Sequence, residues 1–146
     1  MDLLKHASAE GRPADPAALL AAIPFCRHLG LSVERAGDGG LVLVMPFSPH
    51  LIGNPVLPAL HGGTIGAFLE TVAIAQVVWE LGGAQLPKPI DIAIDYLRSG
   101  RAVESRARAR IAKRGRRVVN VHAELWQEDE AKPIAALRGH LLLPGG

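Results

Sequence analysis

Four consecutive segments in the second half of the chain alternate apolar and polar residues with a period of two. They cover residues 90–96, 103–111, 118–127 and 134–143. This alternation is typical of β-strands that bury one face and leave the other in water. Only short polar turns separate the last three segments. Because such short connections join antiparallel neighbours, the sequence predicts an antiparallel sheet.

A single long helix is predicted before these strands, from Thr64 to Leu81. Its apolar residues recur near one face at helical spacing, and a glycine pair after Leu81 supplies a stop signal. Polar residues interrupt it, Glu70 among them. We therefore expect a core helix rather than a membrane span.

The residues before this helix predict shorter elements. An Asp-Pro pair opens a short helix at residues 16–23, and residues 31–33 and 41–47 are strand-like around an Asp-Gly turn. Residues 48–60 are rich in proline and glycine and are predicted to form a loop. No βαβ alternation favours a parallel sheet. The order predicts an α+β fold in which an antiparallel sheet wraps around one long central helix.

The length of 146 residues is within the usual range for one domain. Residues 1–15 are predicted to be a flexible lead-in without the apolar stretch of a secretory signal, and residues 16–146 a single domain. Cys26 is the only cysteine, which excludes an intramolecular disulfide and a cysteine-rich zinc site. The 6 histidines lack metal-ligand spacing. We expect a cytoplasmic protein without a bound metal.

Basic residues are concentrated between Arg98 and Arg117, although the formal net charge is only +2. This concentration favours an anionic ligand. Arg106, Arg108 and Arg110 share one strand face, for which a solvated outer surface is favoured over phosphate binding or subunit packing. Nucleic acid is not an expected partner, because aromatic residues make up only 4% of the chain and no zinc-finger spacing is present.

The residues His61, Gly62 and Gly63 stand directly before the long helix. Glycines there leave backbone N–H groups bare at a helix N-terminus, where the helix dipole also favours negative charge on a bound oxygen. Glu70 follows about two turns later, and a carboxylate in an apolar helix needs a cleft, a partner or another subunit. These groups predict acyl transfer, in which a carboxylate attacks a polarised carbonyl or activates water. For His61 we favour orientation of the loop over proton transfer.

The segment LHGGTIGAFLE resembles the signature of hotdog-fold acyl-CoA thioesterases, in particular the phenylacetate-degradation type within the 4-hydroxybenzoyl-CoA thioesterase superfamily. The resemblance spans residues 25–143 and includes IDIAIDYLRSG and ARIAKRGRRVVNVHAEL. It implies a hotdog fold in which the Gly62 N–H polarises the thioester carbonyl and Glu70 acts as base or nucleophile. Gly63 and Thr64 are then expected to contact the substrate.

The resemblance also implies that each active site lies between two subunits, which supply the glycine and the carboxylate separately. A homodimer is therefore expected, and a homotetramer is left open. Asn54 is implied to place the water, although its spacing from His61 is one residue longer than usual in the family. Pro89 stands near where many relatives carry a hydroxyl, so this position predicts no hydroxyl partner.

The basic turn Arg114-Gly115-Arg116 has two interpretations, a site for CoA phosphates or a solvated hairpin tip, and the sequence leaves both open. Hydrolysis of acyl-CoA is expected to need neither a metal nor an organic cofactor, because a thioester is already activated. The alternative function is non-catalytic binding of acyl-CoA on the same fold. A hotdog hydratase is disfavoured because its acid-base motif is absent.

Overall fold

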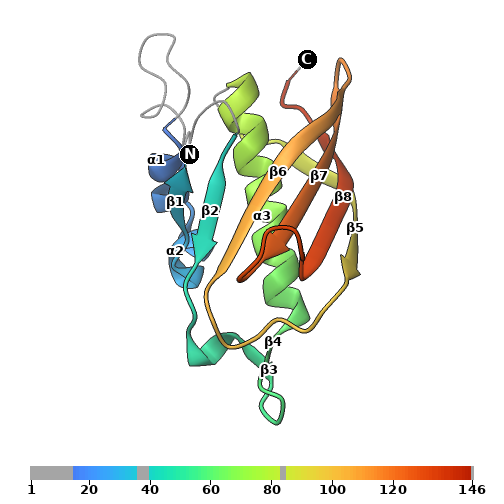
Figure 1. Cartoon of the computed structure of the whole chain (residues 1–146). Coiled ribbons are helices and arrows are strands. Elements are labelled where there is room, and N and C mark those ends of the chain that lie inside the picture. Colours follow the sequence, from blue (N-terminus) through green and yellow to red (C-terminus); the bar gives the residue numbers. More distant parts are fainter. Residues whose placement is uncertain (1–14, 36–39, 83–84, 146) are drawn as a thin grey trace.

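The computed structural model describes residues 15–35, 40–82 and 85–145. One long helix, α3 (Gly62–Leu81), lies against a large antiparallel sheet that curves around it (Figure 1). The predicted α+β hotdog fold class is therefore confirmed. The predicted lead-in and the Asp-Gly tip of the first hairpin fall largely on residues 1–14 and 36–39, outside the described residues.

The elements follow one another as two short helices, two strands, a small ribbon, the long helix and four strands. The helices are α1 (Pro16–Ala22), α2 (Pro24–Leu29) and α3, with a 3-10 turn at Pro49–Leu51. The strands are β1 (Ser32–Arg35), β2 (Val42–Met45), β3 (Ile52–Asn54), β4 (Ala59–Leu60), β5 (Lys88–Tyr96), β6 (Ser105–Arg114), β7 (Val118–Trp126) and β8 (Ala135–Leu142). Six strands form one sheet in the order β1-β2-β6-β7-β8-β5, and β3 and β4 form a separate two-stranded ribbon.

Before the long helix, the structure departs from the predicted elements at Pro24 and in residues 48–60. Pro24 follows the end of α1, as predicted, but it also opens α2, since proline at the first helical position costs no hydrogen bond. The prediction of a plain loop at residues 48–60 was wrong, because this segment holds the 3-10 turn and the β3–β4 ribbon. These two strands have three and two residues, too short for a period-two pattern to develop.

The buried face of the sheet carries small residues beside larger ones such as Leu125 and Leu137. Ala107 of β6, Ala123 of β7 and Ala135 of β8 are almost fully buried. The helix contributes larger buried side chains, with Phe68 and Val72 both 0% exposed. A core that mixes small and large side chains lets two backbones approach closely at some positions while it stays filled at others.

β5 is an edge strand and packs along the N-terminal half of α3. A Cβ atom on Gly66 would lie 2.9 Å from the Cδ1 atom of Ile94, so a glycine permits this close approach. Ile94 is partly buried, whereas Ile90 is 55% exposed. The predicted burial of alternate residues fails at both ends of the strand: at Ile90, where the register shifts between Pro89 and Asp91, and at Tyr96, which is also 55% exposed.

The opposite face of the sheet carries the arginines of β6. Arg106 pairs with Glu34 at 2.9 Å and Arg108 pairs with Glu130. Arg110 lies 3.0 Å from the ring nitrogen of a histidine on β7. These side chains make ion pairs and hydrogen bonds at the surface, which fits the solvated face favoured from the sequence.

α3 is long and apolar enough to cross a membrane by length and composition. In this fold it is a core helix, because 56% of its apolar stretch is buried inside the protein. The sheet covers the helix, as in the core helix of a soluble protein.

The contact between Gly66 and Ile94 predicts a coupling between two mutations. Gly66→Ala should gain about 1 kcal/mol of helix propensity but crowd the Cδ1 atom of Ile94. Ile94→Val removes that methyl group, so Gly66→Ala should be more favourable in that background by about 0.5 kcal/mol or more. Urea denaturation of the four proteins measures the coupling. Ile92→Val is the matched control on the same strand, and an equal effect of Gly66→Ala in all backgrounds would contradict this packing.

Candidate active site

The side chain of His61 caps the first turn of α3. The helix begins at Gly62, two residues earlier than predicted, so both glycines belong to it. His61 has extended backbone angles (φ −63°, ψ 131°), and its Nδ1 atom accepts the Gly63 N–H at 2.8 Å. Nδ1 is the acceptor in this hydrogen bond, so it carries no proton there. In this arrangement His61 orients the start of the helix.

The Gly62 N–H is the donor that this capping leaves free. The N–H groups of Thr64 and Ile65 donate to the His61 carbonyl at 3.0 and 3.2 Å. Among the described residues the Gly62 N–H has no acceptor, and it lies at the positive end of the helix dipole. It is therefore suited to polarise a bound carbonyl oxygen.

Tyr96 at the end of β5 holds the peptide that joins Gly62 to Gly63. Its hydroxyl donates to the Gly62 carbonyl at 2.8 Å, and a Cβ atom on Gly62 would lie 3.4 Å from the tyrosine ring. Sequence analysis did not single out Tyr96 as a site residue. The alternation over residues 90–96 indicates a face for its side chain, but no local pattern indicates a partner 34 residues away.

Gly53 of β3 is a second residue that sequence analysis missed. A Cβ atom there would lie 2.7 Å from the Cα atom of His61, so a larger residue would push β3 away from the helix cap. The His61 N–H also donates to the Leu51 carbonyl at 2.8 Å. The β3–β4 ribbon therefore fixes the position of His61.

A pocket of about 470 Å³ opens beside Gly62. Its lining comes from β4, the first turn of α3, the end of β5 and the segment after it, namely Ala59, Leu60, Gly62, Ile65, Tyr96, Leu97, Arg98, Ser99 and Gly100. The Leu60 N–H donates to the Gly100 carbonyl at 2.9 Å, and the buried Gln127 side chain bonds both backbone groups of Arg101 at 3.0 and 2.9 Å. The wall is thus held in place, and its size is that of a small-molecule site.

Glu70 lies on the same stripe of α3 as Gly62 and Gly66 and is partly buried. Eight residues separate it from Gly62, which is about 12 Å along a helix axis. An oxyanion donor and an attacking group must both lie within about 3–3.5 Å of one carbonyl group. Glu70 does not line the pocket. Within one chain, Gly62 and Glu70 are too far apart to act on the same carbonyl.

Asn54 closes the turn between β3 and β4. Its Oδ1 atom accepts the N–H groups of Val56 and Leu57 at 3.0 and 3.4 Å. Asn54 is exposed and does not line the pocket. Its role in placing water stays a prediction, as do the substrate contacts of Gly63 and Thr64.

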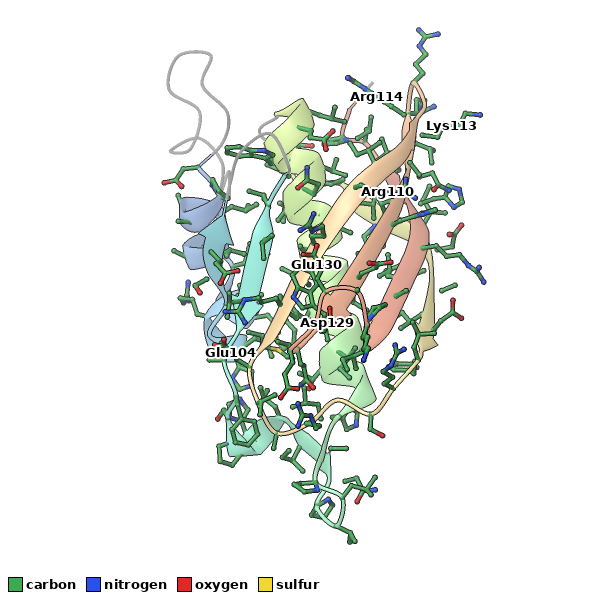
Figure 2. The ribbon with its side chains drawn as sticks, in the orientation of Figure 1. Glu104, Arg110, Lys113, Arg114, Asp129 and Glu130 are labelled. Carbon is green, nitrogen blue, oxygen red and sulfur yellow. The ribbon has the colours of Figure 1, made fainter. Side chains whose placement is uncertain are left out.

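The basic turn Arg114-Gly115-Arg116 lies at the end of β6 that is remote from the start of α3 (Figure 1). Figure 2 shows Arg114 at this end, whereas Glu104 lies toward the other. A Cβ atom on Gly115 would lie 2.6 Å from the Val118 carbonyl oxygen, so this turn requires glycine. β6 has 10 residues, which corresponds to about 33 Å. The turn is therefore distant from the Gly62 of its own chain.

A second hollow of about 330 Å³ lies on the outer face of the sheet. Its lining includes Arg108, Arg110, Glu124 and Arg138, and the sheet separates it from the start of α3. In the described part of the chain, no group of three or more His, Cys, Asp and Glu side chains is placed to hold a metal ion. The pocket beside Gly62, which has a helix N-terminal donor in its wall, is the candidate active site.

The sequence is similar to known thioesterases. A sequence model described as the thioesterase superfamily matches residues 57–134, more than half of the chain. The medium/long-chain acyl-CoA thioesterase YigI of Salmonella typhimurium is 30% identical over 125 residues, which cover 74% of this chain and 78% of that protein. The protein of the same name from Escherichia coli K12 is 28% identical, with the same coverage.

Solved structures share the fold over most of its length. A protein from Chromobacterium violaceum superposes with a TM-score of 0.72 at 36% identity, covering 88% of this chain and 89% of that one. A phenylacetic acid degradation-related protein from Ralstonia eutropha JMP134 gives a TM-score of 0.74 at 28% identity, with coverage of 88% and 98%. A Shewanella oneidensis protein related to the thioesterase superfamily gives 0.73 at 28% identity, with coverage of 86% and 91%.

The capping role of His61 predicts opposite behaviour for two substitutions. His61→Ala leaves the Gly63 N–H without an acceptor, and we expect a loss of about 1 kcal/mol in the free energy of unfolding. His61→Asn supplies a good N-cap oxygen and should retain most of the stability. Urea denaturation of the three proteins measures the difference. Equal stability of the alanine and asparagine variants would show that the ring does not cap α3.

Proposed function

Because the chain belongs to the thioesterase superfamily, we propose that it hydrolyses acyl-CoA thioesters to a free acid and CoA. The family resemblance of LHGGTIGAFLE is confirmed by these matches. One observation carries the proposal beyond the family. The Gly62 N–H is left without an acceptor among the described residues and stands in the wall of a pocket.

In the proposed reaction the thioester carbonyl oxygen accepts a hydrogen bond from the Gly62 N–H, which stabilises the negative charge that develops on that oxygen. Glu70 supplies the carboxylate. It either takes a proton from water that attacks the carbonyl carbon, or attacks that carbon itself and forms an anhydride that water hydrolyses. In both routes the C–S bond breaks and the sulfur of CoA leaves as a thiolate that takes up a proton. Neither route uses a metal or an organic cofactor.

The proposed site requires two copies of the chain, because Gly62 and the Glu70 of the same chain are about 12 Å apart. β5 supports this pairing, since it is an edge strand of 9 residues whereas the other edge, β1, has 4. Ile90 in this strand and Leu97 directly after it are 55% and 51% exposed. Antiparallel pairing of two such edges gives a symmetric homodimer, which further pairing would extend to a homotetramer.

A two-fold axis at β5 also reverses the direction of the second copy. The basic turn of the partner then lies at the Gly62 end of the first chain. There Arg114 and Arg116 offer cations and the Gly115 turn offers backbone donors for the phosphates of CoA. The distance that separates this turn from its own pocket thus favours a contribution from the other subunit.

We assign the acyl group to the medium and long aliphatic chains. The activity named for the YigI relatives supports this assignment. Val56 and Leu57, in the turn next to the pocket residue Ala59, are 89% and 65% exposed and offer apolar surface for such a chain. A cytoplasmic location, with neither nucleic acid nor a membrane as partner, completes the proposal.

The proposed function predicts release of CoA from octanoyl-CoA and palmitoyl-CoA, with phenylacetyl-CoA as the aryl comparison. A thiol reagent can follow this release, because Cys26 is buried and burial raises the pKa of its thiol, which keeps it protonated and slow to react. Glu70→Gln should lower kcat by about 100-fold or more. Glu80→Gln, on the exposed end of the same helix, is the matched control and should retain activity.

Two other outcomes would change the assignment. If no variant hydrolyses any thioester but wild-type protein binds CoA esters, the function is non-catalytic binding of acyl-CoA. If Glu70→Gln is as active as wild type, Glu70 has no part in the reaction.

The shared site predicts that two inactive variants restore each other. Gly62→Pro removes the N–H donor with little backbone change, because proline suits the first helical position and the ψ of 131° at His61 suits a residue before proline. A heterodimer of Gly62→Pro with Glu70→Gln has one site with both defects and one site with none. Heterodimers purified through two different tags should show about half of the wild-type kcat per dimer. Sites formed within one chain would show no recovery.

A further inference from the structure

Two side chains hold opposite ends of one peptide group at the start of α3. The peptide between Gly62 and Gly63 donates its N–H to His61 at 2.8 Å and accepts from the Tyr96 hydroxyl at 2.8 Å through its carbonyl. His61 comes from the residue directly before the helix, whereas Tyr96 comes from the end of β5. This peptide is therefore fixed from two independent parts of the fold.

A restraint at this point has a chemical consequence. Two consecutive glycines have the widest choice of backbone angles of any residue pair, so a helix that starts with them has an adaptable first turn. A donor stabilises an oxyanion best when its direction is set before the reaction begins. Fixing the peptide that follows Gly62 restrains the ψ angle of this residue and thereby the direction of its N–H.

The ring of Tyr96 has a second property that a purely structural contact would not require. One side of it packs against the helix, where a Cβ atom on Gly66 would lie 3.7 Å from the hydroxyl oxygen. The residue is nevertheless 55% exposed and lines the same pocket as Gly62. The tyrosine thus joins the helix start to the surface that a ligand would contact.

We propose that Tyr96 is a positioning residue that aims the Gly62 N–H at the thioester carbonyl and forms the pocket wall against which the acyl thioester packs. This inference rests on the proposed function. It adds to it a residue that acts through the Gly62–Gly63 peptide, and it assigns the hydroxyl and the ring to separate tasks. The hydroxyl sets the donor, and the ring binds the substrate.

Steady-state kinetics with two substitutions separates these tasks. Tyr96→Phe keeps the ring and removes the hydroxyl, so kcat should fall on the order of 10-fold while KM stays unchanged. Tyr96→Ala removes both, so KM should rise as well. Thr71→Val is the matched control, because it deletes a hydroxyl that donates to the Ala67 carbonyl at 2.7 Å on the same helix but outside the pocket. Its kcat should equal that of wild type.

A spectroscopic readout tests the ring contact without turnover. Tyr96 is the only tyrosine of the chain, so 3-fluorotyrosine labelling gives a single fluorine signal. Addition of an S-octyl-CoA thioether, which cannot be hydrolysed, should shift this signal. An unchanged signal at saturating thioether would overturn the assignment of the ring to the pocket wall.

The possible failures are distinguishable. If wild type hydrolyses acyl-CoA and Tyr96→Phe has the same kcat, the positioning role is wrong and the proposed function stands. An equal fall in kcat for Tyr96→Phe and Thr71→Val would also overturn it, since any lost hydroxyl on the helix would then have the same effect. If wild type itself hydrolyses no acyl-CoA, the proposed function is wrong and the inference falls with it.

Discussion

The close approach of α3 to the sheet is the constraint on which the rest of the structure depends. It requires a small residue such as Gly66, where a Cβ atom would lie 2.9 Å from the Cδ1 atom of Ile94. Larger side chains there would hold the helix away from the sheet, and its first turn would lose contact with the end of β5. The packing that buries Phe68 therefore also brings Gly62 to Tyr96. Folding stability and the geometry of the site depend on one interface.

The first turn of a helix has four N–H groups without partners inside the helix. At the start of α3, three of them have acceptors: the His61 N–H donates to the Leu51 carbonyl, the Gly63 N–H to the His61 ring and the Thr64 N–H to the His61 carbonyl. The fourth, on Gly62, is left beside the pocket. A helix end with one free N–H group defines one preferred position for an acceptor. A helix end with several free N–H groups would not. The position of a bound carbonyl oxygen is thus determined by the capping of the neighbouring N–H groups as much as by Gly62 itself.

The features that the sequence predicts well are those that repeat along one element. The period-two pattern predicts β5 to β8 and the helical spacing predicts α3, because apolar residues recur many times on one face of each element. The β3–β4 ribbon is too short to repeat anything, and Pro24 carries a stop and a start signal at once. Local context is enough to predict Gly62 as the N–H donor and Glu70 as the carboxylate. Their separation of about 12 Å also follows from the helical rise. The contacts of Tyr96 and Gly53 could not be predicted, since both join distant segments that meet only after α3 has packed.

Among the described residues, three features have no partner that would explain them. Glu70 is a partly buried carboxylate on an apolar helix, for which a charge needs a solvating partner. β5 is a long edge strand with open hydrogen-bonding groups and exposed apolar side chains. The basic turn at Gly115 lies at the wrong end of β6 for the pocket of its own chain. In the proposed homodimer, one symmetric copy placed against β5 would meet all three. Because the three features are far apart in the sequence and differ in chemistry, the proposed exchange of catalytic groups between two chains joins them in one arrangement that none of them defines alone.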